Sequence, residues 1–245
     1  AMPAELVKRG GSGRERSSDA ATWAVLCYSR RQAHCSGRPM ISVGERPDSA
    51  IDERSSVTAT SPELRGLVSD LLASAPAGAE DPRRRALLES IVSTCISLAS
   101  DGAAIPDLKL IDAALAEIRR ALNCFAPYAT KRKVATFGSA RTRPADPEYR
   151  LARDFASAAA KAGYMIITGA GPGVMRACQE GAGREQSFGV NIRLPFENIA
   201  NEFIRGDDKL VEFKYFFTRK LFFLKESSAI VLFPGGFGTH DECFE

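Results

Sequence analysis

The sequence predicts an α/β fold over residues 131–245, a Rossmann-like doubly wound parallel sheet, with a helical extension before it. Two observations lead to this prediction. From Lys131 onward, short apolar segments alternate with segments of helical periodicity, which is typical of parallel strands joined by right-handed helical crossovers. The apolar segments are also continuous rather than alternating, as burial on both faces of a sheet requires.

The expected elements follow from these two patterns. Strands are expected at 133–137, 164–168, 188–192, 210–215 and 230–233. Helices are expected at 147–162, 174–181, 198–203 and 217–227, and another helix is expected to begin near Thr239. In the helix at 217–227 we expect Leu221 and Leu224 to face the core.

The first half of the chain has a different character. Residues 1–60 are polar and aperiodic apart from two short apolar patches, and we expect a mostly disordered tail. Residues 61–130 contain three helix start signals, at Ser61-Pro62, Asp81-Pro82 and Pro106. Apolar stripes at helical spacing follow each signal, so we predict a helical extension whose stripes pack into a core.

Composition excludes several classes of protein. The chain has 245 residues, of which 44% are hydrophobic and 26% charged, and its net charge is +3. This charge is too small to favour nucleic acid or an anionic membrane as a partner, and no apolar run approaches the roughly 20 residues of a spanning helix. Six cysteines without CxxC spacing predict reduced thiols and a cytoplasmic location. Two histidines and no ligand spacing predict no metal site.

Glycines gather where the predicted strands end. Because ligands of such sheets bind beyond the carboxyl ends of the strands, these glycines favour a nucleotide or phosphosugar pocket. They are Gly138 after the first strand, Gly169, Gly171 and Gly173 after the second, and Gly235, Gly236 and Gly238 after the last.

The last of these loops carries the most chemistry. Residues 230–233 read as a buried strand that runs into the glycines, Thr239, Asp241 and Glu242. Glycine N–H groups and the start of a helix suit a phosphate. A carboxylate close to that anion either takes part in catalysis or merely complements the helix dipole, and the residues alone leave both open.

The type of nucleotide is constrained by two negative observations. Residues 169–173 read GxGxG rather than the dinucleotide GxGxxG, and no GxxxxGK[ST] loop is present. Arg193 follows the third predicted strand, where an NAD-binding domain carries an acid. Arg193 would suit the 2′-phosphate of NADP, so NADP stays open as an alternative.

Over about residues 133–245 the sequence resembles the Lonely Guy family, the cytokinin riboside 5′-monophosphate phosphoribohydrolases and related nucleotide 5′-monophosphate nucleosidases. Pro234–Glu242, PGGFGTHDE, fits the family's PGGxGTxxE motif. Thr218-Arg219-Lys220 fits the Arg-Lys pair that precedes it, and Gly138-Ser139 and Gly169–Met175 resemble two further loops. The older label of the family, possible lysine decarboxylase, has no support here, because we can place neither a Schiff-base lysine nor a pyridinium partner.

The resemblance implies hydrolysis of nucleoside 5′-monophosphates to a free base and ribose 5-phosphate, without a cofactor, by a homo-oligomer. It implies Arg219 and Glu242 as the catalytic pair, with Arg219 either polarising the base or gripping the phosphate. It gives His240 no role. The implied substrate-binding residues are Gly138, Ser139, Gly169, Gly171, Gly173, Met175, Lys220, Gly235, Gly236, Gly238 and Thr239.

Two rival functions and one departure accompany this resemblance. The scaffold also resembles molybdenum-cofactor carriers, which do not need the pair of Arg219 and Glu242. An NADP-binding regulator would need Arg193 to contact a ligand phosphate. Family members continue beyond the position of Glu245, so we expect the domain to be truncated at its C-terminus.

Overall fold

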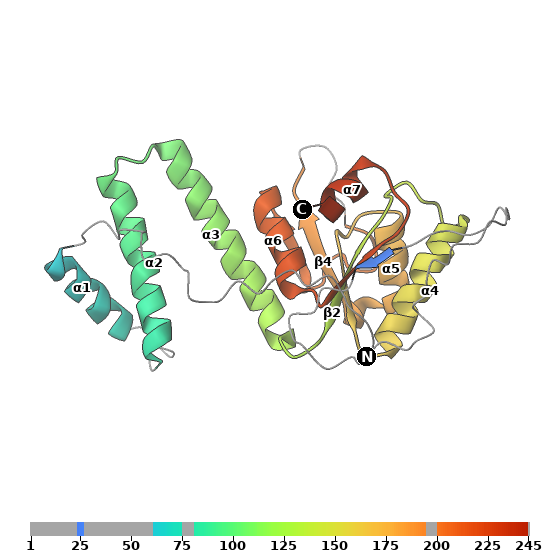
Figure 1. The fold of residues 1–245 in the computed structure, drawn as a ribbon, viewed down its shortest axis with the longest axis horizontal. Coiled ribbons are helices and arrows are strands. Elements are labelled where there is room, and N and C mark those ends of the chain that lie inside the picture. Colours follow the sequence, from blue (N-terminus) through green and yellow to red (C-terminus); the bar gives the residue numbers. More distant parts are fainter. Residues whose placement is uncertain (1–23, 27–60, 75–80, 195–199, 245) are drawn as a thin grey trace, which may run out of the picture. The chain divides into compact units, whose positions relative to one another are not determined.

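The computed structural model describes residues 24–26, 61–74, 81–194 and 200–244, and Figure 1 shows their fold. The chain divides into two compact units, and the boundary lies within helix α3 (Ile105–Phe125), between Ile111 and Asp112. The unit that contains the sheet also contains the site. The tail predicted for 1–60 lies outside the described residues except for Ala24–Leu26, which form strand β1.

The other unit contains helices α1 (Pro62–Ala73) and α2 (Pro82–Ser100). Both begin at the predicted signals, since Ser61 and Asp81 accept backbone hydrogen bonds at the two N-termini. Within the described residues of this unit, the apolar stripes of the two helices are packed only in part. Two helices packed on each other bury Val68, but they cannot enclose both stripes. More than half of each of these side chains is exposed: Leu67, Leu71, Leu87 and Ile91.

A mixed sheet forms the centre of the larger unit, and its strand order is β1-β6-β2-β3-β4-β5. The strands after β1 are β2 (Lys133–Phe137), β3 (Met165–Thr168), β4 (Ser187–Ile192), β5 (Leu210–Phe213) and β6 (Ala229–Leu232). These five are parallel to one another, and β1 pairs with β6 in the antiparallel direction. The predicted Rossmann-like parallel sheet is confirmed.

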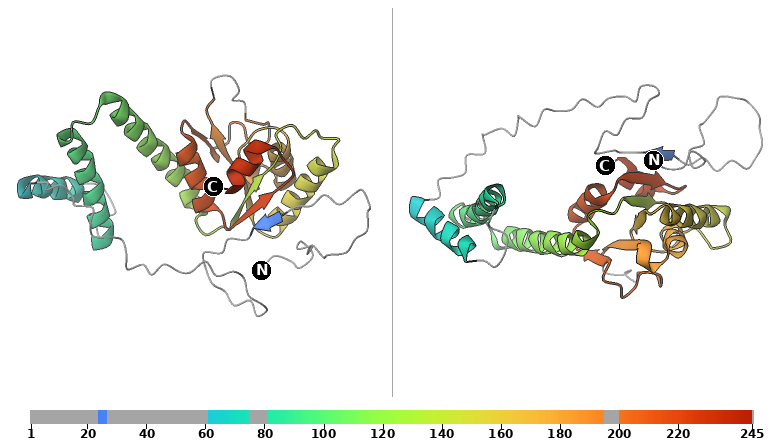
Figure 2. Two further views of the ribbon diagram at one scale, coloured as in Figure 1. Left: turned by 45° about the horizontal axis from the view of Figure 1, so that its top comes forward. Right: turned by 90° about the horizontal axis from the view of Figure 1, so that it is seen from below.

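Helices cover both faces of this sheet (Figure 2). Helices α4 (Pro147–Lys161) and α5 (Val174–Ala182) pack on one face against Val134 and Ile166. The second half of α3 and helix α6 (Phe216–Glu226) pack on the other face against Ala135 and Ile167. Neighbouring residues of one strand thus enter different cores, which explains the continuous apolar runs.

The strand order contains one reversal of direction. The chain moves from β2 through β3 and β4 to β5, and then α6 returns it to β6 on the other side of β2. Strands β2 and β6 are therefore neighbours, and the chain leaves their carboxyl ends in opposite directions. Ligands of open α/β sheets bind at such a switch point.

The helix predicted at 198–203 is wrong in its described part, since residues 202–206 form turns. The side chain of Asn201 competes with a helix there. Its amide donates to the carbonyl of Ala170 at 3.1 Å, and its Oδ1 accepts the backbone N–H of Phe203 at 3.2 Å. Local hydrogen bonds of this kind offer the backbone an alternative to a helix.

The inward face predicted for α6 is also wrong. Leu221 is 47% exposed and Leu224 is 51% exposed, whereas Phe222 and Phe223 are buried. Burying two adjacent aromatic rings removes more apolar surface from water than burying the two leucines. The same rotation of the helix turns Arg219 inward, where it is 8% exposed.

Within the described ranges, no helix combines the length and apolar character needed to cross a membrane.

Candidate functional site

Three loops at the carboxyl ends of β2, β3 and β6 form one connected platform. The backbone N–H of Ser139, after β2, donates to the carbonyl of Pro234, after β6, at 3.2 Å. The carbonyl of Ser139 accepts the N–H of Val174, after β3, at 3.0 Å. The predicted convergence of the glycine loops is therefore built into the backbone.

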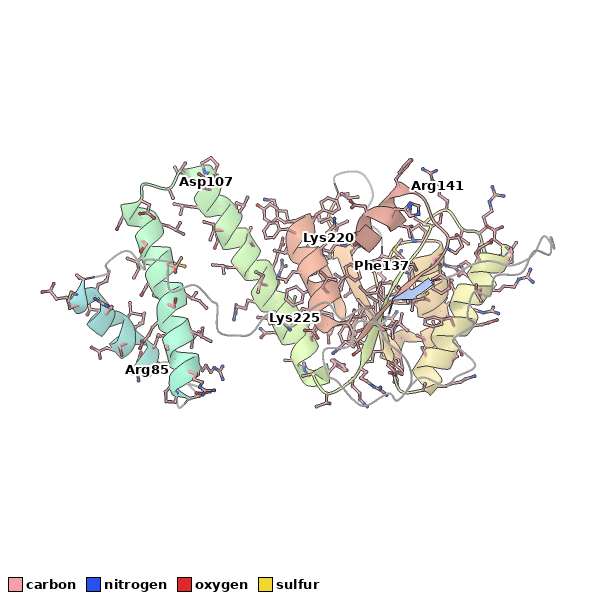
Figure 3. All side chains as sticks on the ribbon, viewed as in Figure 1. Arg85, Asp107, Phe137, Arg141, Lys220 and Lys225 are labelled. Carbon is pink, nitrogen blue, oxygen red and sulfur yellow. The ribbon has the colours of Figure 1, made fainter. Side chains whose placement is uncertain are left out.

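The platform lines a pocket with a volume of about 460 Å³. Nine of the predicted site residues line it: Gly138, Ser139, Gly169, Met175, Arg219, Gly236, Gly238, Thr239 and Glu242. Four predicted residues do not line it: Gly171, Gly173, Lys220 and Gly235. Sequence reasoning missed four lining residues: Phe137, Ala140, Arg141 and Phe237. In Figure 3 the labelled Phe137 and Arg141 lie around the end of β2, and Lys220 lies on α6.

Arg219 and Glu242 form an ion pair on the wall of this pocket. Arg219 Nη1 donates to Glu242 Oε1 at 2.6 Å, and the two side chains are only 10% and 15% exposed. Arg219 Nε also donates to the carbonyl of Val190, at the middle of β4, at 2.9 Å. Two directions of the rigid guanidinium are thus occupied, so the arginine fixes where the carboxylate stands.

Gly169 lets this arginine approach the end of β3. A Cβ at Gly169 would lie 2.7 Å from Arg219 Nη2 and 2.9 Å from Met175 Sδ. Real Cβ atoms do not come this close to nitrogen or sulfur. Glycine at position 169 therefore allows Arg219 and Met175 to pack closely in the pocket wall.

The loop after β3 is held by a buried network of amides. Thr168 Oγ1 accepts the N–H of Ala170, whose φ of 61° is unusual for a residue other than glycine. The amide nitrogen of Asn201 donates to the carbonyls of Ala170 and Gly171 and to Gln179 Oε1. No signal in the single sequence marks Asn201 and Gln179, because the three hydrogen bonds that the Asn201 amide donates span 22 to 31 positions.

Helix α7 (Phe237–Phe244) begins inside the glycine loop, two residues before the expected start. Its first turn therefore offers the N–H groups of Phe237 and Gly238, since initial N–H groups of a helix lack an intrahelical acceptor. Thr239 N–H is already bonded to the carbonyl of Gly236 at 3.0 Å. The Phe237 side chain is 94% exposed at the pocket.

The cations near the pocket differ in their partners. Lys220 Nζ forms an ion pair with Asp241 at 3.1 Å and does not line the pocket. Arg193, the residue that an NADP site would need, pairs with Glu212 at 3.0 Å and is not a lining residue. Arg141 lines the pocket, and its side chain forms no ion pair with any residue that the structure describes.

Cys124 and Cys178 do not provide a nucleophile for the pocket. Cys178 is fully buried between α4 and α5, and burial raises the pKa of its thiol to about 12. Burial likewise raises the pKa of Cys124 to about 11. Both remain thiols near neutral pH, and neither lines the pocket. Among the described side chains, no group of three His, Cys, Asp or Glu residues is placed to hold a metal ion.

Part of this chain is similar to known proteins. Residues 173–245 match the family model described as possible lysine decarboxylase. A search of curated proteins returned no match. One similar solved structure is the X-ray structure of TM1055, a structural genomics target, at 26% identity and a TM-score of 0.36. The match covers 46% of this chain and 66% of that one, so this chain spans just under two thirds of its relative. The segment 173–245, which carries both Arg219 and Glu242, is thus similar to the family formerly described as possible lysine decarboxylase, the Lonely Guy family.

Proposed function

We propose that this protein hydrolyses the N-glycosidic bond of nucleoside 5′-monophosphates, of the cytokinin type or ordinary purine nucleotides, and releases a free base and ribose 5-phosphate. The observation that carries the proposal is the ion pair of Arg219 and Glu242 on the wall of a glycine-lined pocket of about 460 Å³. Burying an ion pair costs desolvation free energy, which only good hydrogen-bond geometry offsets. The proposed reaction would explain why this chain keeps such a pair beside the proposed phosphate site.

The proposed reaction needs little more than this carboxylate. As the bond from C1′ to the base nitrogen lengthens, positive charge develops on the ribose, and Glu242 stabilises that charge. Water then attacks C1′ and gives a proton to Glu242. The bonding electron pair leaves with the base, whose ring nitrogen takes up a proton from solvent, and Glu242 then returns its own proton to solvent, so that one water is consumed overall.

Arg219 has a defined part in this scheme. Because its Nε and Nη1 are engaged by Val190 and Glu242, we assign it chiefly to holding the carboxylate. Its Nη2 faces the end of β3, beside Gly169. This assignment differs from the two roles that the resemblance implies, which were gripping the phosphate and polarising the base.

The phosphate would bind to the first turn of α7 and to Arg141. Helix N-termini favour anions through their N–H groups and dipole. A phosphate dianion also calls for a cation, and Lys220 is held by Asp241 outside the pocket wall. Arg141 is the lining cation with no ion pair among the described residues, so we assign it to the phosphate.

The decisive test is a panel of nucleoside 5′-monophosphates incubated with the protein, with release of free base followed by chromatography. We expect base and ribose 5-phosphate in equal amounts from at least one nucleotide. Adenosine, which lacks the phosphate, should be a far poorer substrate than AMP. Tight binding of nucleotides without any base release would instead favour the carrier function.

Arg141→Gln tests the phosphate assignment. A charge-assisted hydrogen bond contributes about 1.5–3 kcal/mol, so we expect the affinity for AMP to fall roughly 10- to 100-fold. The affinity for adenosine should stay the same, which calorimetric titration can measure. Arg143→Gln is the matched control, because it removes the same charge from the same loop at an exposed residue that does not line the pocket. An equal loss in both variants would point to a general field effect and would contradict the assignment.

A cytoplasmic location and a homo-oligomeric state complete the proposal. Cell fractionation measures the first, and light scattering at several protein concentrations measures the second.

A further inference from the structure

Glu117, on the part of α3 that belongs to the sheet unit, is a buried carboxylate with an exposed fraction of 3%. Its Oε1 accepts the backbone N–H of Lys214 at 2.6 Å, and its Oε2 accepts the hydroxyl of Thr218 at 2.7 Å. In the part of the chain that the structure describes, no cation pairs with it. A buried charge in this position is costly, and two short charge-assisted hydrogen bonds offset the cost.

Both partners of Glu117 lie at the N-terminal end of α6. Lys214 precedes the helix, and Thr218 belongs to its first turn. The N-cap residue of α6, Tyr215, makes no capping hydrogen bond with its side chain. A negative group near its N-terminus stabilises a helix. For α6 this group is the carboxylate of Glu117, which belongs to another helix.

The residue after Thr218 is Arg219. Its guanidinium bridges the carbonyl of Val190 and the carboxylate of Glu242 at 2.9 and 2.6 Å, so it tolerates little displacement of the turn that carries it. We propose that Glu117 is a positioning residue, which fixes the first turn of α6 and thereby sets Arg219 against Glu242. For its consequences in catalysis this inference rests on the proposed function.

The other end of α6 offers a matched comparison. Glu226, the last residue of α6, forms an ion pair with Lys133 at 3.3 Å, and the side chains are 9% and 3% exposed. Buried charges thus hold both ends of one helix, but only Glu117 holds the end that carries Arg219. A variant at Glu226 removes a buried anchor without touching that end.

The experiment compares Glu117→Ala, Glu117→Gln and Glu226→Ala in the whole chain. A displacement of about 1 Å at a catalytic group can cost a hundredfold, so we expect Glu117→Ala to lower kcat roughly 10- to 100-fold, with a much smaller change in KM. Glu117→Gln should restore most of the rate. Its oxygen can accept from Lys214 and its amide can donate to Thr218, whose hydroxyl then turns to the carbonyl of Tyr215 at 2.9 Å. Glu226→Ala should lower the melting temperature but leave kcat unchanged.

A second measurement does not depend on the proposed function. The Nε–H of Arg219 is hydrogen-bonded to Val190, and its exchange with solvent can be followed by NMR in protein labelled with ¹⁵N-arginine. We expect faster exchange in Glu117→Ala, and the wild-type rate in Glu117→Gln and Glu226→Ala. Wild-type exchange in a folded Glu117→Ala variant would overturn the inference. Altered exchange in a protein that hydrolyses no nucleotide would sustain the positioning role and reject the proposed function alone.

If Glu117→Ala does not fold, Thr218→Val replaces it in the exchange measurement. It keeps the shape of the side chain and removes one of the two hydrogen bonds to Glu117. Faster exchange of the Arg219 Nε–H supports the inference, and unchanged exchange overturns it.

Discussion

Glu242→Gln is expected to lower the rate of base release by roughly a hundredfold or more, while binding of the nucleotide is retained. The amide keeps the shape of the side chain but removes the charge that meets the developing positive charge on the ribose. Loss of one preorganised electrostatic group commonly costs about 3 kcal/mol of transition-state stabilisation. Because that charge acts chiefly in the transition state, kcat should fall and affinity should not.

Asp241→Asn is the control for this change, since the neighbouring carboxylate lies outside the pocket wall and pairs with Lys220. Its rate should remain close to that of the wild type. Base release by single-turnover kinetics and nucleotide affinity by calorimetry provide the two measurements. Undiminished hydrolysis by Glu242→Gln would falsify the catalytic assignment, and Glu242 would then only complement the helix dipole.

Gly173→Ala is expected to destabilise the sheet unit by about 3 kcal/mol or more. The φ of Gly173 is +67°, which strains any other residue by roughly 1–3 kcal/mol. A Cβ there would also overlap the backbone of Ser139 and Ala140, and backbone cannot move aside as a flexible side chain can. Overpacking of this kind adds about 1–3 kcal/mol.

Gly183→Ala separates the two causes. Its φ is +78°, but a Cβ would meet no atom within 4 Å, so this variant should show the conformational cost alone. Thermal unfolding followed by circular dichroism should give a clearly lower midpoint for Gly173→Ala than for Gly183→Ala. Equal midpoints would mean that the loops after β2 and β3 are not held as close together as the structure has them.

Most of the sheet unit could be predicted because its signals are local. Continuous apolar runs marked the strands, and glycines marked the ends at which the loops converge. Helix α6 was misjudged at Leu221 and Leu224 because its orientation depends on partners far away in sequence, namely the aromatic core around Phe222 and Phe223 and the contacts of Arg219. The helix expected at 198–203 failed because Asn201 bonds to a loop about thirty residues earlier.

The site shows the same division between local and distant signals. Arg219 and Glu242 were identified because the motifs around them are contiguous, whereas Arg141 lies in no quoted motif and was missed. Lys220 neighbours Arg219 in sequence, yet consecutive helical positions point about 100° apart, and it meets Asp241 instead of the pocket. The role assigned to Glu117 depends on residues about a hundred positions away, which one sequence cannot reveal.

The hydrogen bonds that join Ser139 to Pro234 and to Val174 have an evolutionary consequence. They make the platform of the three loops a property of the main chain, which most substitutions of single exposed side chains leave in place. The proposed catalysis, by contrast, depends on a few side chains such as Glu242. Under this proposal, a lineage that loses this carboxylate keeps the loops to which the phosphate would bind. Under the same proposal, one nucleotide change can convert the hydrolase into a sensor or carrier, and selection can retain the descendant for binding alone.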